Sequence, residues 1–191
     1  MGQTPLSPLM PLSGKGKALL ILNLVGLAFI WATGLYAYMS IKGVIPTHFG
    51  PSGRPDAYGS SEVFLIVTPL ISIAPVAIIL MARYRFTLVN KYPYLINLPA
   101  FYAYITRVPF ERRGYWVNRY FETMLAIGAF LTLYFNLLLL EIYLGTVQEA
   151  LPSWFLPTTF LMMPLMVGAL FYYFYRLSNQ MKKEMTEVNQ K

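Results

Sequence analysis

Four long apolar runs without charge most constrain what this chain can fold into. No charged residue occurs between Lys17 and Lys42 or over 63–82, and two further runs, 123–140 and 154–175, are also free of charge. An α-helix needs about 20 apolar residues to cross the ~30 Å hydrocarbon core of a bilayer. We therefore predict four membrane-spanning helices over 18–41, 63–82, 120–143 and 154–175.

The composition agrees with an integral membrane protein. Of the 191 residues, 57% are hydrophobic and 12% are charged, whereas soluble domains are about 25% charged. Pro69 and Pro75 lie inside the second run, and spanning helices tolerate proline where neighbouring groups satisfy the freed carbonyls. The chain has no cysteine, which excludes disulfides and cysteine-ligated metal sites. The expected fold class is all-α, with four transmembrane helices, a cytoplasmic interfacial segment and an ordered outer loop.

The Lys and Arg residues predict the orientation. Thirteen of them lie in 1–17, 83–119 and 176–191, against two, Lys42 and Arg54, in the other connections. Because cytoplasmic segments are enriched in these residues, we expect a multi-pass protein of the plasma membrane with both termini in the cytoplasm. The net charge of +7 then reflects topology and attraction to anionic lipid head groups. Nucleic acid is not an expected partner.

The same patterns divide the chain into five parts. These are a flexible cytoplasmic lead-in (1–16), a two-helix unit (17–82) with an outer loop at 44–61, a cytoplasmic interfacial connection (83–119), a second helix pair (120–176) and a cytoplasmic tail (177–191). The uncharged middle of the connection, 92–106, is too short to span a bilayer. We expect it to lie in the interface and to be partly helical after Asn97-Leu98-Pro99.

Cations and aromatic rings are mixed at the end of this connection. The residues are Arg112, Arg113, Trp116 and Arg119. Single-stranded nucleic-acid sites combine the same residue types, but an anchor in the head-group layer accounts for all four beside a membrane. We therefore predict that these residues contact lipid.

The outer loop carries the only histidine of the chain, and its Pro and Gly residues favour a compact, ordered conformation. Two interpretations stay open. In one, His48 donates a hydrogen bond that holds the loop to the helix ends, and Asp56 caps a turn. In the other, the loop is a ligand or recognition site, with Glu62 as a further polar group. The residues of that site would be Pro46, His48, Phe49, Gly53, Arg54, Pro55, Asp56 and Gly59.

One motif in this loop resembles a known family. The pattern is Pro46-x-His48-Phe49-x3-Gly53-x-Pro55-Asp56-x-Tyr58-Gly59-Ser60. It resembles the signature of a bacterial and archaeal membrane domain of unknown function that occurs in SdpI-type toxin immunity proteins, and the resemblance covers 18–82. It implies a polytopic membrane protein. Family members often carry Lys after the Gly-Ser pair, where this chain has Ser61, and the immunity proteins have additional spans of which this chain shows no clear copy.

Two polar residues interrupt the third run near its end. Glu141 is a functional candidate because acidic residues in spanning helices are rare, although it falls near the outer interface, where a carboxylate can reach water. Asn136 lies deeper and is expected to bridge helices. No group of residues has the spacing of a known metal motif. If a metal were bound at His48, the carboxylates of Glu141 and Glu149 would be the further ligands.

No nucleophile–base pair, phosphate loop or dinucleotide fingerprint occurs in the sequence. The leading hypothesis is a non-enzymatic protein without a cofactor. It would bind, sense or give immunity to something at the outer face, or serve as an accessory subunit that packs against a membrane-protein partner or a second copy. The alternative is a small transporter or membrane enzyme that uses His48, Asp56 and Glu141 at the outer face.

Overall fold

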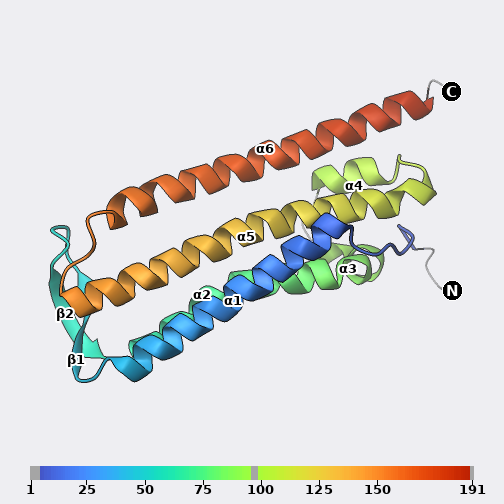
Figure 1. Ribbon diagram of the computed structural model, residues 1–191. Helices are drawn as coiled ribbons and strands as arrows, with labels where there is room; N and C mark the ends of the chain where they lie inside the picture. The colour runs from blue at the N-terminus through green and yellow to red at the C-terminus, as the bar shows by residue number, and fades with distance from the viewer. Residues whose placement is uncertain (1–4, 96–98, 190–191) are drawn as a thin grey trace. The chain divides into compact units, whose positions relative to one another are not determined.

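A computed structural model of the chain describes residues 5–95 and 99–189. The elements follow in the order α1 (Gly14–Ser40), β1 (Val44–Phe49), β2 (Pro55–Ser60), α2 (Val63–Arg83), α3 (Arg85–Lys91), the 3-10 helix η1 (Pro93–Leu95), α4 (Pro99–Ile105), α5 (Phe110–Gln148) and α6 (Phe155–Asn189) (Figure 1). Helices α1, α2, α5 and α6 are long and apolar enough to cross a membrane. The predicted all-α membrane protein with four spanning helices is therefore confirmed.

The helices extend beyond the predicted spans. Helix α1 begins at Gly14 instead of residue 18, α5 begins at Phe110 instead of residue 120, and α6 continues to Asn189 through the predicted tail. Hydropathy locates the part of a helix that hydrocarbon surrounds, but a helix continues into water as long as its residues favour helix. The polar end of α6 is rich in Lys, Glu and Met, which are good helix formers.

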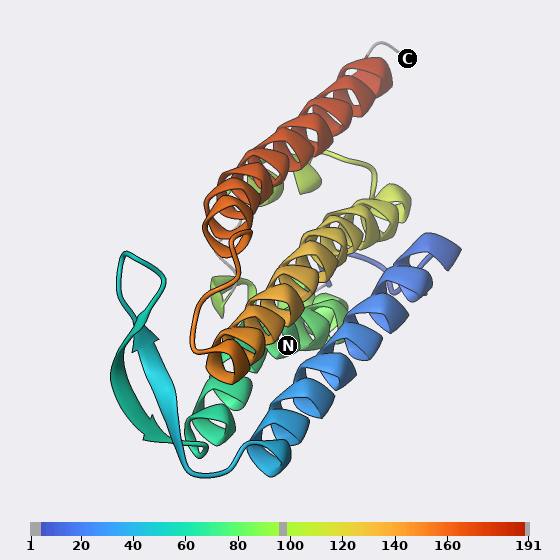
Figure 2. The ribbon, with the colours of Figure 1, turned by 60° about the vertical axis from the view of Figure 1, so that its left-hand side comes forward.

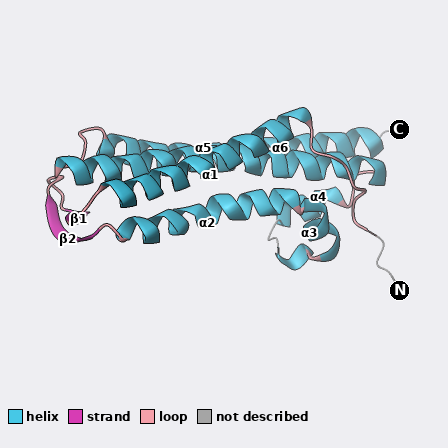
Figure 3. Cartoon of the chain, turned by 60° about the horizontal axis from the view of Figure 1, so that its bottom comes forward, coloured by secondary structure: helices cyan, strands magenta, loops and turns pink. Residues whose placement is uncertain are grey.

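The predicted connection folds into the short elements α3, η1 and α4 (Figure 3). Helix α4 begins at Pro99, in agreement with the expected helix after that residue, while Asn97 and Leu98 lie outside the described residues. A helix that begins with proline is common, because the N–H that proline lacks would have no partner in the first turn.

The chain divides into two compact units, each built from several segments. The first contains Met1–Ile21, Ile78–Ile127 and Gly168–Lys191, and we call it the α3–α4 unit. The second contains Leu22–Ala77 and Gly128–Val167, and we call it the hairpin unit. Each has its own cluster of buried apolar side chains.

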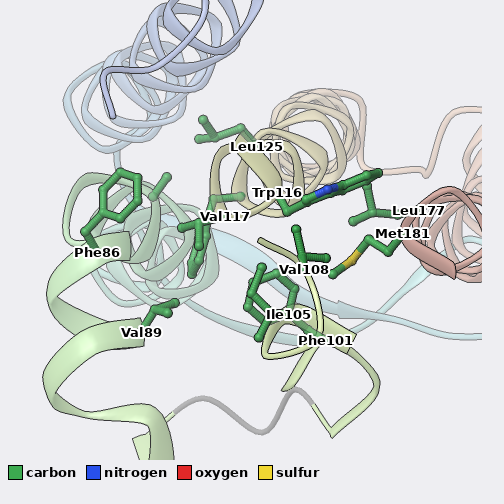
Figure 4. Close-up of a cluster of buried hydrophobic side chains, with 12 residues drawn as sticks. Phe86, Val89, Phe101, Ile105, Val108, Trp116, Val117, Leu125, Leu177 and Met181 are labelled. Carbon is green, nitrogen blue, oxygen red and sulfur yellow. The ribbon is translucent and has the colours of Figure 1, made fainter. Parts of the chain in front are cut away.

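The core of the α3–α4 unit is aromatic and aliphatic (Figure 4). Its buried members include Phe86 and Val89 of α3, Ile105 of α4, Trp116 and Phe121 of α5, and Leu177 and Met181 of α6. Burial of one such side chain stabilises the fold by about 1.5–3 kcal/mol. This core explains why α3 and α4 form ordered structure although neither is long enough to span a membrane.

Side chains of the same unit hold the segment that precedes α1. Backbone groups of this segment are hydrogen-bonded by four residues: Arg113 binds Leu6, Asn90 binds Ser7, Arg85 binds Met10 and Asn118 binds Pro11. The lead-in that we expected to be flexible is thus tied to α3 and α5 over the part that the structure describes. The reason is that residues 5–12 form no helix or strand, so their backbone groups are available to side chains from distant parts of the sequence.

The first turn of α1 is capped from two sides. Ser13 Oγ accepts a hydrogen bond from Gly16 N at 3.0 Å, as an N-cap side chain does. Glu122 of α5 accepts a hydrogen bond from Ser13 N, also at 3.0 Å. In a capping box, a Glu three residues after the N-cap accepts the hydrogen bond from the N-cap backbone N–H. Here a carboxylate from another helix accepts that hydrogen bond.

In the hairpin unit, β1 and β2 form an antiparallel pair that connects the end of α1 to the start of α2 (Figure 2). Val44 pairs with Ser60 and Pro46 with Tyr58, and the register is irregular next to His48. Gly53 lies in the turn with φ 74°, a conformation that glycine adopts without steric cost. The loop that we predicted to be compact and ordered is this hairpin.

The helices of the hairpin unit approach closely where glycine occurs. A Cβ at Gly26 of α1 would lie 2.6 Å from Thr132 Cγ2 of α5, and a Cβ at Gly34 would lie 2.9 Å from Thr68 Cβ of α2. Small residues at helix interfaces allow such an approach in membranes, where packing drives helix association.

Candidate binding site at the hairpin

His48 and Asp56 face each other across the hairpin. His48 Nδ1 lies 2.5 Å from Asp56 Oδ1, and because an ionised carboxylate only accepts hydrogen bonds, the imidazole N–H donates. The two side chains are 70% and 50% exposed. An exposed pair of this kind contributes about 0–1 kcal/mol to stability, so it orients the imidazole more than it stabilises the hairpin.

A cavity of about 450 Å³ lies beside this imidazole. One wall is His48, Phe49 and the turn residues 50–53, and the other wall is the segment 151–156 that leads into α6. Leu151 N donates a hydrogen bond of 2.9 Å to Gly53 O, which joins the two walls. Cavities of several hundred Å³ are the usual size for small-molecule sites.

The chemistry of the cavity is mixed apolar and neutral polar. Phe49, Leu151, Phe155 and Leu156 supply apolar surface, and the polar side chains are the imidazole of His48 and the hydroxyls of Ser52 and Ser153. Carboxylates and Lys or Arg side chains are not among its lining residues. A ligand with an apolar body and one or two hydrogen-bonding groups would fit this lining.

The turn beside the cavity is held by backbone hydrogen bonds. Gly50 N donates to Arg54 O, and Gly53 N donates to Gly50 O, both at 2.9 Å. Gly59 faces Thr47, because a Cβ at Gly59 would lie 2.8 Å from Thr47 Cγ2. Gly53 lines the cavity, whereas Pro46, Arg54, Pro55, Asp56 and Gly59 shape the hairpin outside the cavity lining.

Glu141 is not part of this cavity. Its side chain is buried in α5, with 1% of the residue exposed, and within the described residues Oε1 has no hydrogen-bond partner. Asn136, a little more than one turn earlier, donates from Nδ2 to Gly26 O of α1 at 3.0 Å and to Thr132 O at 2.8 Å. The structure therefore does not bring Glu141 into the cavity that His48 lines, and it places Asn136 as a bridge between two helices.

Three of the four residues predicted to contact lipid form hydrogen bonds to other residues of the protein. Arg112 Nε donates to Glu184 Oε1 at 2.9 Å, and Trp116 Nε1 donates to Glu184 Oε2 at 3.0 Å. Arg113 donates to the carbonyls of Leu6, Thr106 and Val108. Trp116 is 3% exposed and belongs to the buried core of this unit. Contact of the four residues with lipid stays a prediction.

Sequence reasoning missed the central role of Arg85. This buried side chain donates from Nε to Asn118 Oδ1 at 2.6 Å, from Nη1 to Ala82 O at 2.9 Å and from Nη2 to Met10 O at 2.7 Å. Burial lowers the pKa of its guanidinium, and the carboxylate of Glu122 opposes that shift. The sequence contained no signal for this role, since Arg85 is one of seven cations in the connection.

A metal site is not apparent in the described part of the chain. Residues 5–95 and 99–189 contain no group of three or more His, Asp or Glu side chains placed to hold a metal ion.

Comparison with known proteins places the chain in a family. Over 177 aligned residues it is 41% identical to an uncharacterized protein of the archaeon Archaeoglobus fulgidus. The aligned region covers 93% of this chain and 97% of the relative. The chain belongs to the family of this archaeal protein. Residues 25–73 also match the family described as "Domain of unknown function (DUF1648)". No solved structure matches the chain.

The DUF1648 match has a clear structural meaning. It runs from the middle of α1 through β1 and β2 into α2, so it contains the whole hairpin. The segment 151–156, which forms the other wall of the cavity, lies outside the match.

Proposed function

We propose that this protein is a non-enzymatic membrane protein that binds a ligand or partner at the hairpin. The observation that carries the proposal is the cavity between the hairpin turn and the segment 151–156, with the imidazole of His48 at its wall. The pairing of His48 with Asp56 fixes the ring while most of it stays accessible. Such a cavity fits an apolar ligand with a hydrogen-bonding group better than it fits a charged one.

In this proposal the hairpin is on the outer face of the plasma membrane. The distribution of Lys and Arg supports this orientation, with both termini in the cytoplasm. Sensing of an extracellular molecule and immunity to a toxin are two forms that the function would take. The resemblance of the hairpin motif to SdpI-type proteins favours immunity, which is a proposal that rests on the motif alone.

An accessory role in a larger membrane assembly is a second candidate, and α6 favours it. None of the most apolar part of α6 is buried, compared with 28% for α5. Large apolar side chains on α6, such as Phe160, Leu161 and Phe171, are mostly exposed. Lipid would cover them in an isolated protein, and a membrane-protein partner or a second copy would cover them in an assembly.

The test is purification of the protein from its native membrane in mild detergent, followed by mass spectrometry of small molecules, metals and proteins. Ser52→Trp fills the cavity, and His48→Ala removes its imidazole. The matched control is Val44→Trp, because Val44 lies on the same hairpin, is 78% exposed and does not line the cavity. We expect a small molecule or partner with the wild type and with Val44→Trp, and at least a tenfold loss with Ser52→Trp.

Equal recovery of the bound species with Ser52→Trp would contradict binding in the cavity. A stoichiometric protein partner that stays with all hairpin variants would instead support the accessory role.

A further inference from the structure

A second cavity lies in the α3–α4 unit, among the polar ends of three helices. It has a volume of about 230 Å³. Its lining includes Lys15 of α1, Arg119 and Glu122 of α5, and Tyr173, Arg176 and Gln180 of α6. The cavity thus collects three cations and one carboxylate from parts of the chain that are far apart in sequence.

The carboxylate offsets only one of the three positive charges. Glu122 is buried and its Oε1 accepts the hydrogen bond from Ser13 N that caps α1. In the described part of the chain, Lys15, Arg119 and Arg176 form no ion pair. With three cations and one carboxylate, the lining of the cavity carries an excess of positive charge.

Arg119 differs from the other arginines of this unit that reach into the protein. Its Nε is fully buried and has no hydrogen-bond partner in the described residues. Arg85 and Arg113, in contrast, donate from all three guanidinium nitrogens to acceptors of the protein. A buried charged donor without an acceptor is costly, so a ligand that carries acceptor oxygens would be stabilised at Arg119.

The three cations stand at corresponding places in their helices. Lys15 lies just before the first charge-free run, Arg119 precedes the charge-free residues 123–140, and Arg176 is the first charge after 154–175. These are the points where a spanning helix leaves the hydrocarbon and enters the head-group layer. Tyr173 supplies an aromatic ring of the kind enriched at that level.

We propose that this cavity binds the phosphate group of an anionic lipid. The guanidinium groups of Arg119 and Arg176 would donate hydrogen bonds to phosphate oxygens, since the planar fork of Arg matches phosphate geometry. Lys15 would add a third positive charge, and Gln180 would donate to a further oxygen or to the head group. The site is independent of the hairpin cavity, and Arg119 is the one predicted lipid-contact residue that lines it.

The experiment measures lipid binding by the full-length protein in a neutral detergent. Native mass spectrometry would follow titration with phosphatidylglycerol, with phosphatidylcholine as the zwitterionic lipid and with glycerol phosphate as the soluble source of the same group. The variants are Arg119→Gln and Arg176→Gln. The matched control is Arg107→Gln, because Arg107 is an exposed cation of the same unit that does not line the cavity.

We expect the wild type and Arg107→Gln to bind one phosphatidylglycerol with the same affinity, and each cavity variant to bind it at least tenfold more weakly. Equal affinity of all four proteins would overturn the proposal. Glycerol phosphate that binds as tightly as the lipid would overturn the assignment to a lipid. Arg176 is exposed, so Arg176→Gln keeps the test decisive if Arg119→Gln does not fold.

Discussion

In the α3–α4 unit, Arg85, Asn90 and Arg113 bind backbone groups of distant segments, whereas in the hairpin unit helices approach each other through Gly26 and Gly34. Long polar side chains can hold irregular backbone because their donors satisfy its free carbonyls. Close helix packing needs no such donors, because helical backbone satisfies itself. The two units thus show two ways to stabilise a chain with 57% hydrophobic residues.

We expect the largest effect from removing the hydrogen bonds of Arg85 in the α3–α4 unit. Arg85→Met leaves Asn118 Oδ1 and the carbonyls of Ala82 and Met10 without their donor. We expect a loss of about 3 kcal/mol or more in the free energy of unfolding, measured by denaturant titration in detergent. Arg83→Met is the control, because Arg83 is exposed and two residues away. Equal stability of the two variants would contradict a structural role for Arg85.

The next largest effect is expected from a change in the close helix packing at Gly34 of the hairpin unit. Gly34→Ala puts a methyl group 2.9 Å from Thr68 Cβ, and overpacking of this kind costs about 1–3 kcal/mol. The double variant Gly34→Ala, Thr68→Ala should recover part of the loss, because it removes Thr68 Oγ1 and Cγ2, which also crowd the new methyl group, and leaves only the contact with Cβ.

Gly168→Ala is the matched control for this packing, since a Cβ at Gly168 meets no atom within 4 Å. Replacing an unencumbered helical Gly by Ala stabilises by roughly 0.5–1 kcal/mol, so this variant should gain slightly. If Gly168→Ala and Gly34→Ala change the thermal midpoint equally, the close approach of helices at Gly34 does not determine the stability change.

A smaller effect concerns the segment before α1. Asn90 Oδ1 accepts from Ser7 N at 2.9 Å, and Asn90 Nδ2 donates to Ser7 O at 3.0 Å. Asn90→Ala should cost about 1–2 kcal/mol and accelerate hydrogen exchange at the Ser7 amide. The neighbouring exposed residue gives the control variant Lys91→Ala, which should leave that exchange unchanged. Unchanged exchange in Asn90→Ala would mean that the segment is held by its other contacts.

The smallest effect is expected at the hairpin. A double-mutant cycle with His48→Gln and Asp56→Asn should give a coupling energy of about 1 kcal/mol or less, because both side chains are exposed to water. The coupling should fall further at high salt. A coupling above ~2 kcal/mol would show that this pair stabilises the hairpin as strongly as a buried contact.

Part of the candidate site was predictable from sequence. The Pro and Gly residues of 44–61 indicated an ordered loop, and His48 stood out as the only histidine. The β pairing of that loop was not predicted, because Pro46 and Pro55 are unusual in strands and the segment shows no regular alternation. The second wall of the cavity, 151–156, was missed because nothing in its sequence indicates that Leu151 binds Gly53.

The sequence by itself determined the four spanning helices, because the absence of charge over about 20 residues is a local property that hydrocarbon enforces. Only the tertiary structure decided which arginines of the described residues find hydrogen-bond acceptors within the protein and which do not. Arg85, Arg113 and Arg119 look alike in sequence, yet the first two find carbonyl acceptors and the third does not. The reason is that a guanidinium can bind any carbonyl within reach, and what lies within reach depends on segments up to 107 residues away.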